Sequence, residues 1–256
     1  MKTQAIIVTH NNSTTIHTCL QSLQANNIPA IIIDNASTDD TVAQIKSYPH
    51  VQLIHSPANL GFAAAANQAA ALSSANTLLF LNPDAILPAN IQQDIQTVWA
   101  KYPQAGIVGF LLCDTHGHPE PQGFGAPVTP LHSFSRKWQS PTIPTQATPV
   151  GWVSGGAFII HRRLWQQLNG FDPQFFLYWE DVDLCLRVNQ AGYQVLLLPT
   201  IKVTHQKGAS FTNNGQKTQI YDQSADRYFR KHYAFPIWGI LHLMRRFYRL
   251  LGYQAK

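Results

Sequence analysis

Short apolar runs alternate with longer amphipathic stretches through the first 110 residues of the chain. The apolar runs are AIIVT (5–9), AIIID (30–34), VQLI (51–54), TLLFL (77–81) and GIVGF (106–110). Runs this short and this uniformly apolar are typical of strands that are buried on both faces of a sheet. The stretches between them predict helices near residues 14–25, 39–47, 62–72 and 88–101. The alternation predicts an α/β fold with a doubly wound, mostly parallel central sheet flanked by helices.

The regular alternation stops at residues 113–150, which are rich in Pro, Gly, Thr and Ser. We interpret this segment as a long irregular excursion from the sheet. Regular patterns return with an expected strand at 157–160 and an expected helix at 162–168. A further helix is expected at 181–191, because Gly192 is a suitable C-cap, and the strand QVLLLP follows it.

The last stretch of the chain, PIWGILHLMRRFYRLLGYQAK (236–256), has the spacing of one amphipathic helix. Four residues form its basic face: His242, Arg245, Arg246 and Arg249. The other positions are mostly aliphatic or aromatic, and a helix of this composition is typical of an interfacial anchor on an anionic membrane. The alternative is a helix that packs on the body of the protein and leaves its arginines in water.

The charge of the chain is unevenly distributed. Residues 1–201 carry 8 Lys or Arg and 11 Asp or Glu, whereas residues 202–256 carry 10 Lys or Arg and 2 Asp or Glu. The basic C-terminal part is therefore a candidate surface for anionic lipid, a phosphorylated substrate or nucleic acid. It has no recognised nucleic-acid-binding motif, and its aromatic residues lie on the apolar side of the expected helix. We therefore predict no nucleic-acid partner.

The three cysteines, Cys19, Cys113 and Cys185, are far apart and form no C-x-x-C pair. This spacing argues against zinc and against a disulfide framework, and it favours a reduced, cytoplasmic setting. The first residues contain too short an apolar run for a signal peptide, and no run reaches the ~18–20 apolar residues of a membrane span. We expect a cytoplasmic protein that is peripheral at the inner face of the plasma membrane if its C-terminal helix binds lipid.

Acidic residues follow two of the expected strands directly. Asp34 ends the AIIID run, and Asp84 lies in NPDA after the TLLFL run. Ligands of parallel α/β sheets bind at the carboxyl ends of the strands, so both carboxylates are candidate ligand contacts. Asp84 is a suitable ligand for magnesium or manganese, and its alternative role is that of a turn residue after Asn-Pro. The chain lacks G-x-G-x-x-G after the first strand and lacks G-x-x-x-x-G-K-[ST], so dinucleotide and P-loop sites lose their main support.

Three of the 13 acidic residues fall within four positions, Glu180 to Asp183, directly after the aromatic run FFLYW (175–179). Asp181 or Glu180 could cap the expected helix, and Asp183 is expected to pair with Arg187 one turn later. Desolvation beside an apolar wall raises the pKa of a carboxyl group, which makes it a better general base. A position at a helix N-terminus lowers that pKa, so the two effects oppose each other.

Six ordered motifs together resemble one family. They are VTHNN, IIDNASTDDT, NLGFAAAANQA, FLNPDA, the block that begins VSGGAF and ends VLLLP, and VTHQKGAS. Over about residues 4–211 the chain resembles glycosyltransferase family 2, in its rhamnosyltransferase-like branch. The resemblance implies a GT-A fold and inverting transfer of a sugar from a nucleotide-diphosphate donor. The implied GT-A domain is 1–211, with a nucleotide-binding half (1–112) and an acceptor and catalytic half (113–211), before a helical extension at 212–256.

The resemblance also implies roles for individual residues. The expected donor-nucleotide contacts are Thr9, Asn11, Asp34, Asn67 and Asn82. Asp84 and His205 correspond to ligands of a divalent metal, magnesium or manganese, and Asn82 replaces the first acid of the family's D-x-D motif. Asp181 corresponds to the catalytic base, and Glu180 beside it is expected to raise its pKa by like-charge repulsion.

The expected acceptor contacts are Gly155, Gly156, Tyr178 and Trp179. The glycines would leave room for the acceptor, or alternatively mark a bulge at a strand start, and the aromatic rings would offer a face to a sugar. The expected partners are a dTDP- or UDP-linked sugar, with rhamnose favoured by the branch, and a glycan or lipid-linked glycan acceptor. Because Asn82 weakens the expected metal site, a non-catalytic nucleotide-sugar-binding scaffold stays an alternative hypothesis.

Overall fold

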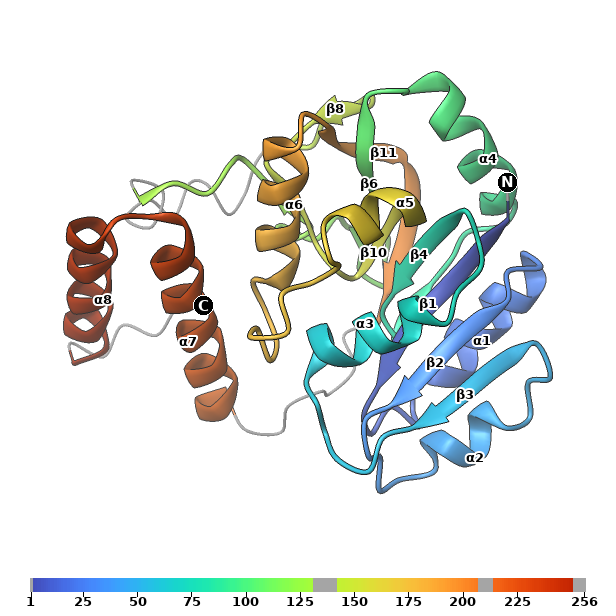
Figure 1. Ribbon diagram of the computed structural model, residues 1–256. Coiled ribbons are helices and arrows are strands. Elements are labelled where there is room, and N and C mark those ends of the chain that lie inside the picture. The colour runs from blue at the N-terminus through green and yellow to red at the C-terminus, as the bar shows by residue number, and fades with distance from the viewer. Residues whose placement is uncertain (1, 131–141, 207–213, 251–256) are drawn as a thin grey trace.

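The computed structural model of the protein describes residues 2–130, 142–206 and 214–250. Within these ranges a central sheet has the strand order β3-β2-β1-β4-β10-β6-β11-β5, and β8 pairs with β11 (Figure 1). The strands of this sheet are β1 (Thr3–Thr9), β2 (Ala30–Asp34), β3 (Val51–His55), β4 (Thr77–Leu81), β5 (Ala85–Ile86), β6 (Ala105–Cys113), β8 (Thr148–Pro149), β10 (Ala157–His161) and β11 (Gln194–His205). A separate pair of short strands is formed by β7 (Phe124–Gly125) and β9 (Trp152–Val153).

Helices pack on both faces of the sheet. The helices before β11 are α1 (Ile16–Ala25), α2 (Thr41–Ile45), α3 (Phe62–Ala71), α4 (Ile91–Lys101), α5 (Arg162–Gln167) and α6 (Glu180–Gln190). In β1, Ala5 and Ile7 belong to the core layer of α1, whereas Ile6 and Val8 belong to the layer of α3. Burial of both faces explains why the strands read as unbroken apolar runs, and the predicted α/β fold is confirmed.

The sheet departs from the parallel arrangement at β10, and the short strands β5 and β8 also pair antiparallel with β11. β1 to β4 are parallel where they pair, and so are β6 and β11. β10, however, runs antiparallel to both β4 and β6. Parallel neighbours need a crossover connection, usually a helix, and the chain between β6 and β10 contains no helix among its described residues. The sheet is therefore mixed, and its reversal places the start of β10 at the same edge as the end of β4.

Two helices follow β11. They are α7 (Asn214–His232) and α8 (Phe235–Leu250), which lie next to each other at one side of the molecule (Figure 1). His242 of α8 lies 2.7 Å from Asp226 of α7. The predicted C-terminal amphipathic helix is thus present as α8 up to residue 250, and its last six positions lie outside the described residues. None of the described helices is both long enough and apolar enough to cross a membrane.

Candidate active site

Three of the predicted nucleotide contacts meet at the carboxyl ends of β1 and β2. Thr9 pairs with Asp34 in the parallel ladder. The Asn11 N–H donates to Ser37 Oγ over 2.9 Å, and the Ser37 N–H donates to Asp34 Oδ2 over 3.1 Å. Asp34 is 2% exposed, and its Oδ1 has no hydrogen-bond partner among the described residues. Buried polar atoms normally have partners, so this oxygen without a partner keeps Asp34 a candidate ligand contact, as the sequence predicts.

A second polar group forms where β11 pairs with β5. His205 is paired with Ala85, which places it beside Asp84. Nε2 of His205 lies 3.1 Å from Asp84 Oδ1 and 3.4 Å from Asn82 Nδ2, and its Nδ1 lies 3.1 Å from Glu120 Oε1. The structure therefore brings together Asn82, Asp84 and His205, as the sequence predicts. It adds Glu120, which sequence reasoning missed.

The two carboxylates control the charge of His205. Burial disfavours the imidazolium ion, but the hydrogen bonds and charges of Asp84 and Glu120 outweigh it and raise the pKa of His205 to about 9. The same donor set suits a divalent cation. Two ligand atoms at right angles, each about 2.1 Å from an ion, are about 3 Å apart, and His205 Nε2 and Asp84 Oδ1 are 3.1 Å apart.

Protein ligands alone do not complete such a site. Among the described residues, no group of three or more His, Cys, Asp or Glu side chains is arranged to hold a metal ion. Asp84 and His205 therefore offer two adjacent ligand positions, and a cation there would take its other ligands from water and from phosphate oxygens, as magnesium usually does. Glu120 is placed to accept the Nδ1 proton of His205, which would leave Nε2 as the metal ligand.

The N-terminus of α6 carries two carboxyl groups beside Gly155. Asp181 Oδ2 accepts the Gly155 N–H and its Oδ1 accepts the Val182 N–H, both over 2.8 Å. Glu180 is 4% exposed, and its Oε2 has no hydrogen-bond partner among the described residues. Burial raises the pKa of both groups, and the charge of Asp181 raises the pKa of Glu180 further. Backbone N–H bonds favour the ionised form of Asp181, so of the two carboxyl groups Asp181 is the one that its hydrogen bonds favour as the carboxylate.

Gly155 and Gly156 connect the two polar groups. The Gly156 carbonyl accepts the Asn82 N–H over 2.9 Å, while the Gly155 N–H is bound to Asp181. A Cβ atom at Gly155 would lie 3.7 Å from Asp181 Oδ2 and 3.8 Å from Glu180 Oε1. A Cβ atom at Gly156 would lie 3.6 Å from Asn82 Nδ2. The expected base and the expected diphosphate side are thus separated by one dipeptide that carries no side chains.

Two predicted contacts have other partners in the structure. Asn67 uses both ends of its amide on the backbone of Phe171, with Oδ1 accepting the N–H over 2.9 Å and Nδ2 donating to the carbonyl over 2.8 Å. Trp179 is 6% exposed and packs against Tyr228 and Phe229 of α7. These contacts give Asn67 and Trp179 structural roles. Tyr178 is only half-buried, so it keeps the predicted role of an acceptor contact.

The predicted pair of Asp183 and Arg187 is confirmed. Their side chains meet at 2.8 Å one helical turn apart. Asp183 is fully buried, and its carboxylate also contacts Lys231 and His232 of α7. Burial raises the pKa of Asp183, but these hydrogen bonds and cations outweigh burial and lower it. Asp183 is therefore an ionised residue that joins α6 to α7.

Comparison with protein families identifies the family of the chain. Residues 4–168 match the family described as Glycosyl transferase family 2, and this range spans more than half of the chain. The protein belongs to this family. Membership establishes it as a glycosyltransferase. The matched range contains Thr9, Asp34 and Asp84 and ends before Asp181 and His205, and the roles of all these residues stay predictions.

Related proteins agree with this assignment. An N-acetylglucosaminyl-diphospho-decaprenol L-rhamnosyltransferase from Mycobacterium tuberculosis is 28% identical over 208 residues, which are 72% of this chain and 68% of that protein. The solved structure of a mannosyltransferase from Pyrobaculum calidifontis, in complex with GDP-Man and Mn2+, matches this chain with a TM-score of 0.64 at 17% identity. The match covers 94% of this chain and 68% of the mannosyltransferase. GalNAc-T7 with UDP, GalNAc and Mn2+ has a TM-score of 0.67 at 17% identity, and this chain spans 48% of its length.

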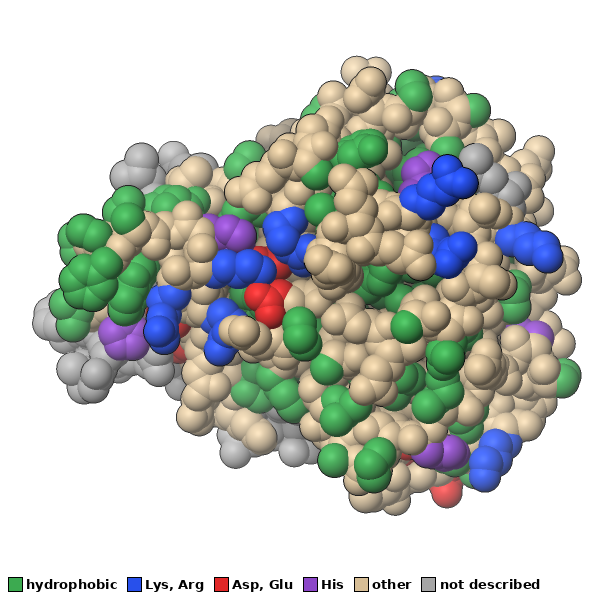
Figure 2. Space-filling view, viewed as in Figure 1, with side chains coloured by type: hydrophobic (Ala, Val, Ile, Leu, Met, Phe, Trp, Pro, Cys, Tyr) green, Lys and Arg blue, Asp and Glu red, His purple; other side chains and the backbone are tan. Residues whose placement is uncertain are grey.

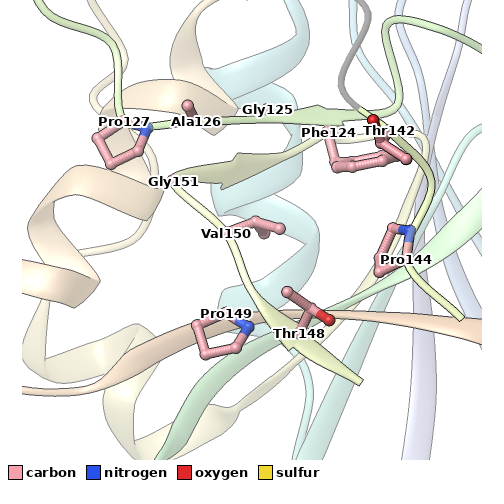
Figure 3. A pocket seen from close by; sticks show the side chains of 10 residues that line it. All are labelled: Phe124, Gly125, Ala126, Pro127, Thr142, Pro144, Thr148, Pro149, Val150 and Gly151. Atoms are coloured by element: carbon pink, nitrogen blue, oxygen red, sulfur yellow. The ribbon is translucent and has the colours of Figure 1, made fainter. Parts of the chain in front are cut away.

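One cavity of the glycosyltransferase is lined by none of the carboxylates described above. It has a volume of about 440 Å3 and is lined by the short strands β7 and β8 and by residues next to them in the chain (Figure 3). Its lining is mostly apolar and includes Phe124, Pro144, Pro149 and Val150, with no residue of the polar groups described above. The cavity belongs to the irregular 113–150 region, and we assign it no part in donor binding.

Proposed function

We propose that this glycosyltransferase moves a sugar, rhamnose, from a dTDP- or UDP-linked donor to a hydroxyl group of a glycan or lipid-linked glycan, with inversion at the anomeric carbon. The rhamnosyltransferase from M. tuberculosis supports this choice of sugar and of a lipid-linked acceptor. The two solved structures support a nucleotide-linked donor and a divalent metal.

The single observation that carries the proposal is the pairing of Asp181 with the Gly155–Gly156 dipeptide. The Gly155 N–H holds Asp181, and the Gly156 carbonyl holds the Asn82 backbone next to Asp84 and His205. A donor whose diphosphate reached Asp84 and His205 would present its anomeric carbon toward this dipeptide. An acceptor hydroxyl between that carbon and Asp181 would then be attacking from the face opposite the leaving group, as inversion requires.

Each residue has a defined task in this arrangement. Asp181 accepts the proton of the acceptor hydroxyl as its oxygen attacks the anomeric carbon. Burial and the charge of Asp181 raise the pKa of Glu180, which favours its protonated form beside the base. Asp34 and the backbone near Thr9 and Asn11 bind the nucleoside. A divalent cation at Asp84 and His205 would supply positive charge to the leaving diphosphate.

Release of nucleoside diphosphate tests the proposed reaction. The full chain with Mn2+ is incubated with dTDP-rhamnose, UDP-GlcNAc or GDP-mannose, each with and without a polyprenyl-diphosphate-linked GlcNAc acceptor. We expect acceptor-dependent release from dTDP-rhamnose, with an inverted anomeric centre in the product. Retained configuration, or no acceptor-dependent release from any donor, would contradict the proposal.

Glu120 provides a test of the metal site that does not depend on turnover. Glu120→Gln is expected to weaken Mn2+ binding by about 10- to 100-fold, because it removes the carboxylate that orients a metal-binding histidine. Titration calorimetry with Mn2+ and dTDP measures this change. Glu120→Asp, which keeps the charge on a shorter side chain, is the control and should recover part of the affinity. Equal Mn2+ affinity in Glu120→Gln and wild type would show that Glu120 does not orient His205 toward a metal.

The helix α8 supports attachment to a membrane surface. Four of its large apolar side chains are exposed, namely Phe235, Ile237, Ile240 and Leu243, with exposed fractions of 41% to 71%. They form a patch at the left edge of the molecule (Figure 2), in a segment whose sequence is rich in arginine. A basic helix with an exposed apolar face is typical of an interfacial anchor. We infer that α8 places the enzyme on the anionic inner face of the membrane, where a lipid-linked acceptor would be found.

Vesicle flotation tests the role of α8. Ile240→Asn with Leu243→Asn is expected to reduce binding to phosphatidylglycerol-containing vesicles by about tenfold or more, because burial of each aliphatic side chain contributes about 1.5–3 kcal/mol. Leu72→Asn is the matched control, since Leu72 is 54% exposed on the main domain. Equal flotation of the double variant and the control would argue that α8 does not bind the membrane.

A further inference from the structure

Two consecutive aromatic residues before α6 have a strained backbone. The φ angles of Tyr178 and Trp179 are 66° and 70°. Residues with a Cβ rarely adopt this left-handed conformation, and it persists where the surrounding structure determines it. This turn leads directly into Glu180 and Asp181. The contacts that hold the turn therefore also determine the orientation of the two carboxyl groups.

The first of these contacts is made by one face of α7. The Trp179 ring packs on three rings of α7, with centroid distances of 5.6 Å to Tyr221, 5.2 Å to Tyr228 and 5.8 Å to Phe229. The Ser224 hydroxyl of α7 donates to the Leu177 carbonyl over 2.8 Å. The turn is thus held by packing on its indole ring and by a hydrogen bond to its backbone.

The second contact is the charge cluster around Asp183. Asp183 Oδ1 lies 2.7 Å from Lys231 Nζ and 2.8 Å from His232 Nε2, both in the last turn of α7. Lys231 also contacts Asp172 over 2.8 Å, in the loop before α6. Basic and acidic side chains gather at this junction between α6 and α7 (Figure 2). A buried carboxylate needs its cations, so the cluster fixes α6 two residues after Asp181.

We propose that α7 is a positioning element of the catalytic centre, which holds the Tyr178–Trp179 turn so that Asp181 faces Gly155. The proposal rests on the proposed role of Asp181 as the base. The matched family range ends at residue 168, so it assigns nothing to α7. On this proposal residues 214–232 belong to the catalytic unit, beyond the domain end at residue 211 that the sequence predicts.

A set of lysine variants tests the role of α7 in turnover. Lys231→Met removes the cation but keeps the apolar stem, Lys231→Arg restores the charge, and Lys217→Met is a matched control at an exposed position of the same helix. We expect Lys231→Met to lower kcat with dTDP-rhamnose by about 10- to 100-fold, because small displacements of a catalytic group have effects of this size. The Kd for dTDP should stay within about twofold of wild type, because Lys231 contacts Asp172 and Asp183 and not the ends of β1 and β2. Lys231→Arg should recover most of kcat, and Lys217→Met should match wild type.

Hydrogen exchange of the full chain gives a readout without turnover. Lys231→Met and the milder Ser224→Ala are expected to speed amide exchange in residues 175–182 by about tenfold or more, with exchange in β2 unchanged. Unchanged exchange in 175–182 in both variants would overturn the proposal, and so would equal acceleration in β2, which would indicate general destabilisation. If wild type transfers no sugar, the proposed function fails, and the exchange data still decide whether α7 holds the turn.

Discussion

Replacement of Asp181 by Asn is expected to lower kcat by roughly 100- to 10,000-fold, the range in which general base catalysis contributes. Asn has nearly the same shape and can still accept the Gly155 N–H, which Asp181 binds over 2.8 Å. It cannot accept a proton from an acceptor hydroxyl. The variant should therefore fold and should bind dTDP with a Kd close to that of wild type, so the loss falls on kcat.

Asp94→Asn is the matched control for this substitution. Asp94 also lies in the first turn of a helix, α4, but it belongs to neither polar group of the site. Its kcat should equal that of wild type. Wild-type turnover in Asp181→Asn would remove Asp181 as the base. Absence of turnover in wild type and variant alike, with dTDP still bound, would favour the non-catalytic scaffold.

The pH dependence of kcat gives a second readout of the same residue. Burial raises the pKa of Asp181, and a base acts only in its ionised form. Turnover should therefore fall as the pH drops through this raised pKa and should be constant above it. An acidic limb near pH 4, where an exposed Asp titrates with a pKa of about 3.9, would contradict a base held in this buried pair.

The strands were predictable because their chemistry is local. A strand that is buried on both faces is mostly apolar. β2 and β4 are buried throughout, and each has four apolar residues and one polar residue at one end. The antiparallel direction of β10 was not predictable in this way. It depends on how the chain returns from the 113–150 excursion, and that segment has no periodic pattern.

The site was predictable only where a motif carried it. Asp84 and His205 are 121 positions apart, and they meet because β11 pairs with β5. Glu120 has no motif around it, and it is placed by the bond of its N–H to the Leu112 carbonyl. The sequence predicted Trp179 as a contact for a sugar ring, because the aromatic run alone does not indicate that α7 packs over the indole ring. The apolar spacing of Tyr221, Ala225, Tyr228 and Phe229 was the available signal for α7 as a packed helix.

Replacement of Asp84 by Ala is expected to abolish Mn2+-dependent stabilisation by dTDP. At a dTDP concentration of 100 Kd, binding stabilises the folded protein by about 2.7 kcal/mol. For a chain of this size that corresponds to a rise in Tm of roughly 5–10 °C. Wild type should show this rise with Mn2+ and lose it with EDTA, and Asp84→Ala should show no rise in either condition.

The rise in Tm should be lost completely in Asp84→Ala, because the site has few other carboxylates that could bind the ion. Asn82 stands where the family motif has its first acid, and Asp84 and His205 are the two protein ligands that the geometry offers. Without Asp84, a neutral His205 would be left as the single ligand, which is insufficient for a hard divalent cation. Asp84→Asn keeps the shape of the side chain but removes its charge, and it should lose the rise in Tm as well. This variant shows whether the loss comes from the missing charge or from altered packing. A rise in Tm that survives both EDTA and Asp84→Ala would instead mean that the nucleotide binds without metal, with the imidazolium of His205 as a candidate cation for the diphosphate.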